Sequence, residues 1–508
     1  MLDKAFLNLS VGVFRIALVG ILGLLLSKIL IEYLGNETYG VIALFTSLNG
    51  YLSLFLIAIS GTVYKFVSIE YFKEEVPHKS IQYFTTAFYS ILLLSASLLT
   101  VLYFLLPLLN HYVDFADNDV NDVKYFFMMS VSSFLMVNIC AIFFVPTMIK
   151  SKLYLNDLSN ILAVTIKFGV VILLYYVFDN LDLYTYGISL LIFGIVYLFI
   201  SIFFAKKAIP AFSISYKYFK LTYAKNMFSM GWKVVVNNIG IILYTNTDII
   251  IINTVLGTLF ITDYSIPMQL AIIVAMFGGM MSRLYDPLLS PLISNGKNKV
   301  LRGRLISHTK IFTLFVGFIF IFLTVYSMKV LNLWLGAEYI RLYYILILLA
   351  LYHFLHQSTV LFSRYFNLTN NLTIPLIVTL LAGVGNIFLS FAFLKFTGLG
   401  VIGVIMATLI TVFLKTNLFN TLYTSFLLKI SIRRLIKSFL PLYSYILVFS
   451  YLSFKLVQRE ITTFEFLDVF SISAIFLLYL GVAYFLLLDK KEKSIFLRMT
   501  KTHNLIRR

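Results

Sequence analysis

Four ionisable side chains lie inside long apolar stretches of the chain, two of them deep inside. Three are cations and one is a carboxylate: Arg15, Lys167, Arg283 and Asp248. An ionisable group is costly in an apolar span, so each of the four is a functional candidate. The cations can bind an anionic group such as a phosphate, for which a guanidinium offers paired donors. The carboxylate can take up a proton or a metal cation.

Each of these groups also has a purely structural interpretation. Arg283 is followed three residues later by Asp286, a spacing that favours a local ion pair. Arg15 lies near enough to the start of its apolar stretch to reach lipid headgroups. Lys167 and Asp248 can neutralise each other.

Polar side chains recur at helical spacing around these charges. One lies seven residues before Arg15, two lie seven and eleven before Lys167, and two lie four and eleven before Asp248. Such spacings place each set on one helical face. The residues expected to face a cavity are Asn8, Asn156, Asn160, Asn237 and Tyr244. His353 and His356 are three residues apart without a third ligand, so neither a metal site nor a cofactor is expected.

The elements that hold these residues are apolar segments of about 20 residues, the length that crosses a bilayer. Hydrophobic residues make up 60% of the 508 and charged residues 12%, whereas soluble domains carry about 25% charged residues. The composition therefore excludes a soluble protein and predicts an all-α polytopic membrane protein. About 14 spans are expected, at 10–31, 39–64, 81–106, 124–149, 157–178, 184–205, 232–256, 263–292, 308–329, 341–363, 371–394, 399–425, 438–457 and 466–488.

The distribution of charge predicts how these spans are oriented. The net charge is +18, from 40 Lys and Arg against 22 Asp and Glu. The basic residues gather in alternate connections and at both ends, so both termini are expected in the cytoplasm, and no nucleic-acid partner is needed to explain the charge. Cations near span ends are expected to anchor at the interface: Lys28, Lys65, Lys310, Arg364 and Lys415. The first apolar run, 11–31, is expected to be a retained helix, and the single cysteine, Cys140, permits no internal disulfide.

An internal repeat predicts two related halves. Residues 158–170 align without gaps on 372–384, and Leu34-Gly35…Tyr39 is echoed by Leu256-Gly257…Tyr264. Six spans separate the copies, so the repeats are parallel and predict two pseudo-symmetric lobes around a central cavity. The expected division is an N-lobe at 1–205, a basic cytoplasmic linker at 206–225, a C-lobe at 226–425, two additional spans within 426–488 and a basic cytoplasmic tail at 489–508.

Several short motifs resemble those of one transporter group in order and spacing. They are Leu34-Gly35-Asn36-Glu37-Thr38-Tyr39-Gly40, Asp248-Ile249-Ile250-Ile251, Asp286-Pro287-Leu288-Leu289-Ser290-Pro291-Leu292, Trp334-Leu335-Gly336-Ala337-Glu338-Tyr339 and the glycine-rich stretch 398–408. Together they resemble the polysaccharide-synthesis (Wzx-like) transporters of the multidrug/oligosaccharidyl-lipid/polysaccharide (MOP) superfamily.

The resemblance implies a flippase for O-antigen, capsular or exopolysaccharide repeat units linked to undecaprenyl pyrophosphate, in the bacterial cytoplasmic membrane. The implied mechanism is alternating access, with the pyrophosphate on Arg15, Lys167 and Arg283 and with H+ or Na+ uptake at Asp248. Membrane lipid is a partner in any case, and the resemblance adds a polymerase and a chain-length regulator as further candidates. The chain contains no Walker A motif, so work would come from an ion gradient.

Three alternatives remain open at this stage. A cation-coupled multidrug exporter of the same superfamily would be expected to carry mainly acidic residues in its cavity. A peptidoglycan-precursor (lipid II) flippase would share the span count and the cationic interior. An O-antigen polymerase or ligase, which would be an enzyme, is the weakest alternative, because the longest outer connection, about 107–123, is short and acidic.

Overall fold

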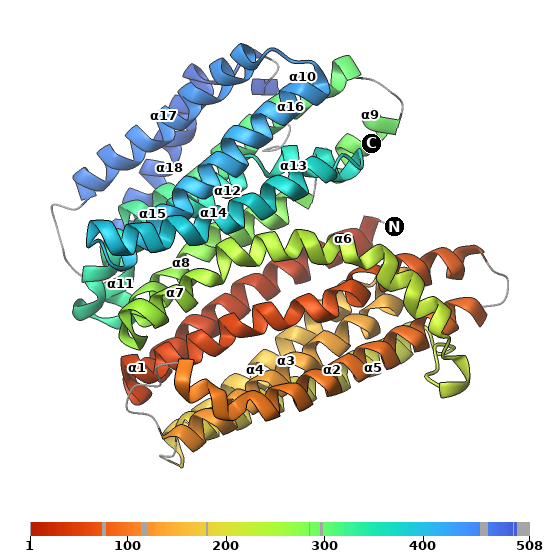
Figure 1. Ribbon diagram of the computed structural model, residues 1–508. Helices are drawn as coiled ribbons and strands as arrows, with labels where there is room; N and C mark the ends of the chain where they lie inside the picture. The colour runs from red at the N-terminus through yellow and green to blue at the C-terminus, as the bar shows by residue number, and fades with distance from the viewer. Residues whose placement is uncertain are drawn as a thin grey trace. The chain divides into compact units, whose positions relative to one another are not determined.

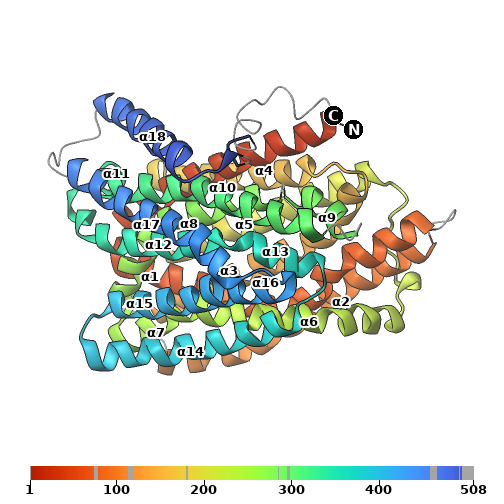
Figure 2. The same cartoon turned by 90° about the horizontal axis from the view of Figure 1, so that it is seen from above.

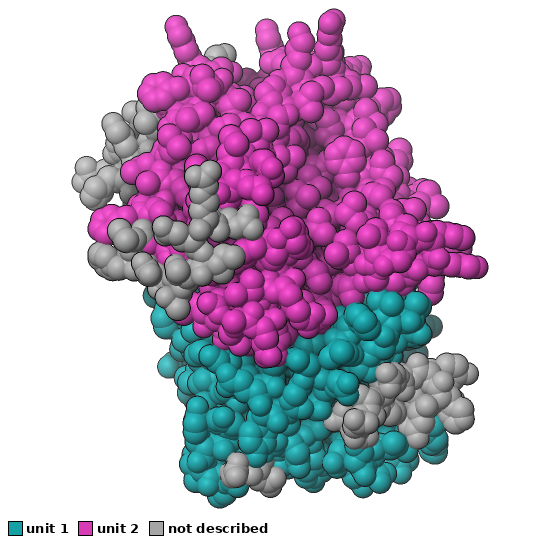
Figure 3. Space-filling model, turned by 90° about the vertical axis from the view of Figure 1, so that its left-hand side faces the viewer, with its two compact units in different colours: residues 1–262 teal, residues 263–508 magenta. Residues whose placement is uncertain are grey.

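The computed structural model describes residues 2–73, 78–112, 119–178, 181–283, 285–294, 298–457, 466–490 and 492–494. These residues form helices and their connections, and this part of the chain contains no β-strand (Figure 1). The chain divides into two compact units, Met1–Thr262 and Asp263–Arg508 (Figure 3). Each unit is described below by itself.

The first unit consists of long helices with short connections. α1 packs against α2, α3, α4 and α6, and α3 packs closely against α5. The helices are α1 (Leu2–Lys73), α2 (His78–Tyr112), α3 (Val120–Ile149), α4 (Tyr154–Tyr176), α5 (Leu183–Ala208), η1 (Tyr216–Tyr218), α6 (Leu221–Thr245) and α7 (Thr247–Leu256).

The second unit has shorter helices and more interruptions. α10 packs against α12 and α17, and α14 packs against α15 (Figure 2). α8 (Thr258–Arg283) begins at the end of the first unit. The remaining helices are α9 (Asp286–Ser294), α10 (Asn298–Val325), α11 (Ser327–Leu335), η2 (Ala337–Leu342), α12 (Tyr343–Ser358), α13 (Val360–Leu368), α14 (Thr373–Thr397), α15 (Val401–Val412), η3 (Phe413–Phe419), α16 (Asn420–Leu428), α17 (Ile432–Val457) and α18 (Phe466–Leu486).

Twelve helices in the described part of the chain are long and apolar enough to cross a membrane, so this is a multi-pass membrane protein. The first, Ser10–Lys73, has 64 residues. Its backbone is not helical at Gly35, which divides it into the two spans expected at 10–31 and 39–64. The apolar part of α18, Phe470–Leu486, is shorter than the other spans. The count of 14 and the cytoplasmic termini stay predictions.

Several expected spans are discontinuous helices in the structure. The span expected at 232–256 is interrupted at Asn246, between α6 and α7, and the span expected at 263–292 comprises α8 and α9. The connection between the spans expected at 263–292 and 308–329 is partly helical, because α10 already begins at Asn298. Hydropathy reports how apolar a segment is but not whether its helix is continuous, which is why the interruptions were not predicted. The basic residues between 298 and 308 are helical because lysine and arginine are good helix formers.

Three Leu-Gly pairs form the same backbone hinge after a helix. Gly35, Gly257 and Gly336 have φ of 82, 97 and 105° with ψ of 169, 173 and 176°. Side chains disfavour this conformation, and glycine adopts it freely. Each hinge is followed by a buried tyrosine: Tyr39, Tyr264 and Tyr339. The echo between the first two motifs is therefore also an echo of conformation, and the third occurrence was not expected from the repeat.

The connection between α5 and α6 belongs to the first compact unit, and the division expected from the repeat stays a prediction. The expected linker, 206–225, lies inside the first unit, because α6 packs along α1 and α2. Thr85 Oγ1 donates to Ser213 O at 3.2 Å, and Lys220 N donates to Thr86 Oγ1 at 3.1 Å. The connection between α5 and α6 is thus held against α2 by hydrogen bonds.

Candidate functional site

Arg15 forms an ion pair that the sequence analysis missed. Its Nε lies 2.7 Å from Oδ1 of Asp157, and both side chains are partly exposed. Asp157 is in the first turn of α4, where a carboxylate also meets the positive end of the helix. Gly12, one turn before Arg15, lies beside the same carboxylate, since a Cβ there would be 3.4 Å from Oδ2 of Asp157. Asp157 is the first residue of the span expected at 157–178, so no sequence pattern indicated it as the partner of Arg15.

Two of the expected cavity asparagines hold the connection between α3 and α4. Asn8 Nδ2 donates to Ser151 O at 3.1 Å, and Asn8 Oδ1 accepts from Tyr154 N at 2.9 Å. Asn156 Oδ1 accepts from Thr147 Oγ1 at 2.5 Å. Their amides therefore attach α1 and α3 to the start of α4, beside the Arg15–Asp157 pair.

The other two expected residues of this group meet around an aromatic pair on α5. The side chain of Asn160 interacts with the hydroxyl of Tyr197. Tyr197 stacks on Phe193, with ring centroids 5.7 Å apart. Lys167 Nζ lies 5.5 Å from the centroid of Phe193, within the range of a cation–π interaction. The ring pair thus connects an amide and an ammonium that both come from α4.

These contacts define a cationic cluster in the first unit, consisting of Arg15, Asp157, Asn160, Lys167, Phe193 and Tyr197. Both Arg15 and Asp157 act electrostatically on Tyr197, so the ion pair and the ring pair are neighbours. Arg15 and Asp157 largely cancel each other. Among the described residues, Lys167 forms no ion pair within 4.0 Å, and the half-buried ammonium supplies the net positive charge of the cluster.

Asp248 lies at the interruption between α6 and α7. It is 0% exposed and belongs to the first turn of α7, where the helix terminus favours a negative charge. The neighbouring Thr247 Oγ1 is 2.6 Å from the hydroxyl of Tyr51 on α1, and Tyr51 interacts electrostatically with Asp248. A carboxylate and hydroxyls at a broken helix are groups that can coordinate H+ or Na+.

The interruption is held against α1 at close range. Asn246 Nδ2 donates to Ser47 O at 3.0 Å. A Cβ at Gly231 would lie only 2.0 Å from Ala58 O, so α1 and α6 approach each other as only glycine allows. The continuous face expected through Asn237, Tyr244 and Asp248 is therefore divided between two helices; Tyr244 is buried and Asn237 partly exposed.

Arg283 is the last residue of α8, and Asp286 is the first of α9. Their side chains lie outside the part of the chain that the structure describes. The expected local pair and the expected phosphate contact of Arg283 both stay predictions.

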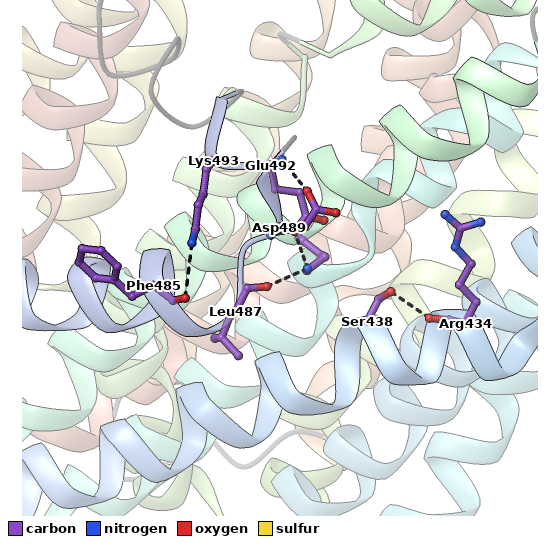
Figure 4. Close-up of polar contacts among 8 residues, drawn as sticks. Arg434, Ser438, Phe485, Leu487, Asp489, Glu492 and Lys493 are labelled. Carbon is purple, nitrogen blue, oxygen red and sulfur yellow. Dashed lines mark hydrogen bonds and ion pairs between the residues drawn. The ribbon is translucent and has the colours of Figure 1, made fainter.

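Other ion pairs lie in the second unit and were not expected. Lys329 pairs with Asp468 at 2.7 Å, and Arg341 makes a two-pronged contact with Asp263 at 2.8 and 2.6 Å. Lys310, which was expected to anchor at the interface, is buried instead. Its Nζ donates to Glu492 Oε2 at 2.7 Å and to Leu487 O at 3.0 Å. Figure 4 shows these two acceptor residues in the segment that follows α18.

The comparisons with known proteins agree with this architecture. No family model matches the chain. The "Uncharacterized membrane protein EpsK" of Bacillus subtilis (strain 168) is 24% identical over 429 residues, which are 83% of each chain.

Solved structures share the fold at low identity. A multidrug resistance MATE family transporter of the MOP superfamily, in an inward-facing conformation, matches with a TM-score of 0.68 and 13% identity, over 83% of this chain and 99% of its own. The lipid II flippase MurJ, in an inward closed conformation, matches with a TM-score of 0.68 and 17% identity, over 96% of this chain and 99% of its own. The chain therefore shares the fold of these transporter and flippase structures.

Proposed function

We propose that this protein is a flippase that carries undecaprenyl-pyrophosphate-linked oligosaccharide repeat units across the bacterial cytoplasmic membrane, for the synthesis of a surface polysaccharide. The observation that carries the proposal is the position of Lys167. A half-buried ammonium rests on an aromatic ring, beside an arginine that is already paired with a carboxylate. Such a cluster favours an anionic ligand, because an anion that enters apolar surroundings needs a charged partner.

The extent of the structural match supports a flippase over an exporter. The match to the lipid II flippase covers 96% of this chain, whereas the match to the inward-facing MATE transporter covers 83%. The chain thus resembles the flippase over a larger part of its length. The fold alone does not distinguish a lipid-linked oligosaccharide from a peptidoglycan precursor as substrate, and the resemblance of the sequence motifs favours the oligosaccharide.

The cationic cluster suggests how a pyrophosphate would be held. Arg15 is paired with Asp157 in this structure. A phosphate group can replace that carboxylate, because a guanidinium binds both groups in the same forked geometry. Lys167 would add a second positive charge, and the glycan hydroxyls would contact amides such as Asn160. The prenyl chain would stay in lipid while the two halves alternate in access.

Asp248 supports coupling of transport to an ion gradient, and it also favours the alternative function, a cation-coupled exporter. A buried carboxylate at a helix break is suited to a coupling H+ or Na+. The same carboxylate would suit a cation-coupled exporter whose substrates are cationic. Association with a polymerase and a chain-length regulator belongs to the flippase proposal only.

Deletion of the gene in its bacterium tests the proposal. We expect loss of the surface polymer, with lipid-linked repeat units retained on the cytoplasmic face of the membrane. Re-expression of the wild-type chain should restore the polymer. Intact surface glycan together with new sensitivity to cationic drugs would refute the proposal and favour the exporter.

A further inference from the structure

A second group of ionisable side chains lies in the interior of the second unit, away from the residues discussed above. His353, His356 and Gln357 follow one another at positions i, i+3 and i+4 of α12, so they share one face of the helix. His353 and Gln357 are each only 6% exposed, and His356 is half-buried. Two imidazoles and an amide are thus removed from water on one helix face.

Two polar atoms of this group lack a hydrogen-bond partner among the described residues: His353 Nε2 and Gln357 Oε1. Buried polar atoms are normally paired, so each exception requires an explanation such as a bound proton, water or ion. α8 packs directly against the amide, because a Cβ at Gly278 would lie 2.7 Å from Gln357 Oε1. The glycine therefore lets α8 approach a side chain that has an unused acceptor.

The charge beside the histidines comes from Lys415 on η3. His353 interacts electrostatically with His356, and His356 with Lys415. The first two turns of α10, which packs against α12, add Lys299, Arg302 and Arg304. Four further cations on elements that pack against α12 have partners elsewhere. Lys310 of α10 bonds to Glu492, Lys329 of α11 to Asp468, Arg341 of η2 to Asp263, and Arg364 of α13 to Ser282. His308 of α10 contacts the ring of Tyr285. The described residues of α15 include no titratable side chain.

The backbone is irregular where this group lies. α12 ends at Ser358, one residue after Gln357, and α13 begins at Val360. η3, which carries Lys415, is a π-helix, a form common at functional sites. Thr359 Oγ1 donates to Thr416 O at 2.9 Å, and Asn417 Nδ2 donates to Ser358 Oγ at 3.0 Å. The break in α12 and the π-helix are therefore hydrogen-bonded to each other.

We propose that His353 and His356 form a proton-binding site of the second unit, distinct from Asp248. A proton on either imidazole adds positive charge beside Lys415, and the repulsion would act on the joined irregular segments of α12 and η3. Irregular segments of this kind can exchange between two packings. Proton binding stands on these contacts alone, while its use to drive transport rests on the function proposed above.

Potentiometric titration of the purified full-length protein in detergent tests the binding directly. The difference between wild type and the double variant H353Q/H356Q should show uptake of roughly one proton on acidification from neutral pH. The variant H78Q removes an exposed imidazole and calibrates the signal of one histidine. A flat difference curve for the double variant would overturn the proposal, because the two imidazoles would then stay neutral throughout.

A second variant keeps the test decisive if H353Q/H356Q does not fold. K415Q leaves both histidines in place and removes the neighbouring positive charge, so the site should take up its proton at higher pH than in wild type. An unchanged titration in K415Q would contradict the electrostatic contact. The coupling role is tested by flipping in vesicles with an imposed pH gradient. If wild type flips equally well with and without the gradient, the coupling role is rejected and the flippase proposal stands. If wild type does not flip at all, only the flippase proposal is rejected.

Discussion

Lys329 and Asp468 form a buried ion pair, with Nζ 2.7 Å from Oδ1. Lys329 lies on α11, and Asp468 lies in the first turn of α18. Their side chains are only 10% and 9% exposed. In a bilayer, apolar packing gives little preference for one helix neighbour over another, because lipid is equally apolar. The ion pair therefore fixes the position of α18 on α11 in a way that apolar contacts cannot.

Asp468→Ala should destabilise the second unit strongly. The substitution leaves a buried ammonium without its partner, which costs about 3–5 kcal/mol. The expected result is a lower apparent Tm of the purified protein in detergent. The exchange K329D/D468K should recover part of the loss, because the pair is restored with its polarity reversed. A Tm equal to that of wild type in Asp468→Ala would show that the pair does not hold α18.

Glu492→Ala should release the segment after α18 from α10. Glu492 and Asp489 bond to each other's backbone N–H, and Glu492 Oε2 accepts from Lys310 (Figure 4). Without this carboxylate, trypsin should cleave at the exposed Lys490 several-fold faster, which mass spectrometry of a time course can measure. Lys493→Ala is the control, since the contacts of Lys493, a long 3.5 Å bond to Phe485 O and cation–π contacts with the rings of Tyr484 and Phe485, are made with α18. Equal cleavage rates in wild type and Glu492→Ala would contradict this role.

Gly35→Ala should destabilise the first unit through its backbone alone. A Cβ at Gly35 meets no atom within 4 Å, but its φ of 82° and ψ of 169° are strained for any other residue. Such strain costs roughly 1–3 kcal/mol. Gly23→Ala is the matched control, because Gly23 also has open space and has no unusual φ. The apparent Tm should fall in Gly35→Ala and not in Gly23→Ala; equal effects would refute the hinge.

Lys167→Ala should lower surface polysaccharide severely, while Lys167→Arg should retain much of it. The arginine keeps a cation that can lie on Phe193 and bind phosphate, and the alanine keeps neither interaction. Surface glycan is measured at matched expression of the two variants. Leu162→Ala, which shortens an exposed apolar side chain on the same helix, is the control. Full activity in Lys167→Ala would remove the lysine from the mechanism.

Sequence patterns predicted a multi-pass membrane protein because apolar length is visible within about 20 residues. They also indicated the echo of Leu34-Gly35 in Leu256-Gly257, but not the positive φ that both glycines adopt. The partner of Arg15 was not predictable in this way. Asp157 follows it by 142 residues, and nothing local indicates which carboxylate an arginine will meet. The interruptions at Asn246 and at Thr359 were missed because isoleucine-rich and leucine-rich segments are equally apolar whether or not their helix is continuous.

Asp248→Asn should separate the two expected coupling ions. Asp248 lies beside the hydroxyls of Thr247 and Tyr51, and such oxygen ligands suit Na+. If the histidine pair on α12 takes the proton, the variant should lose the response of flipping to an imposed Na+ gradient and keep the response to a pH gradient. Asp263→Asn is the control, because that carboxylate serves the ion pair with Arg341 and should affect neither response selectively. Loss of the pH response instead would assign the proton to Asp248, and two unchanged responses would leave Asp248 a structural residue at the start of α7.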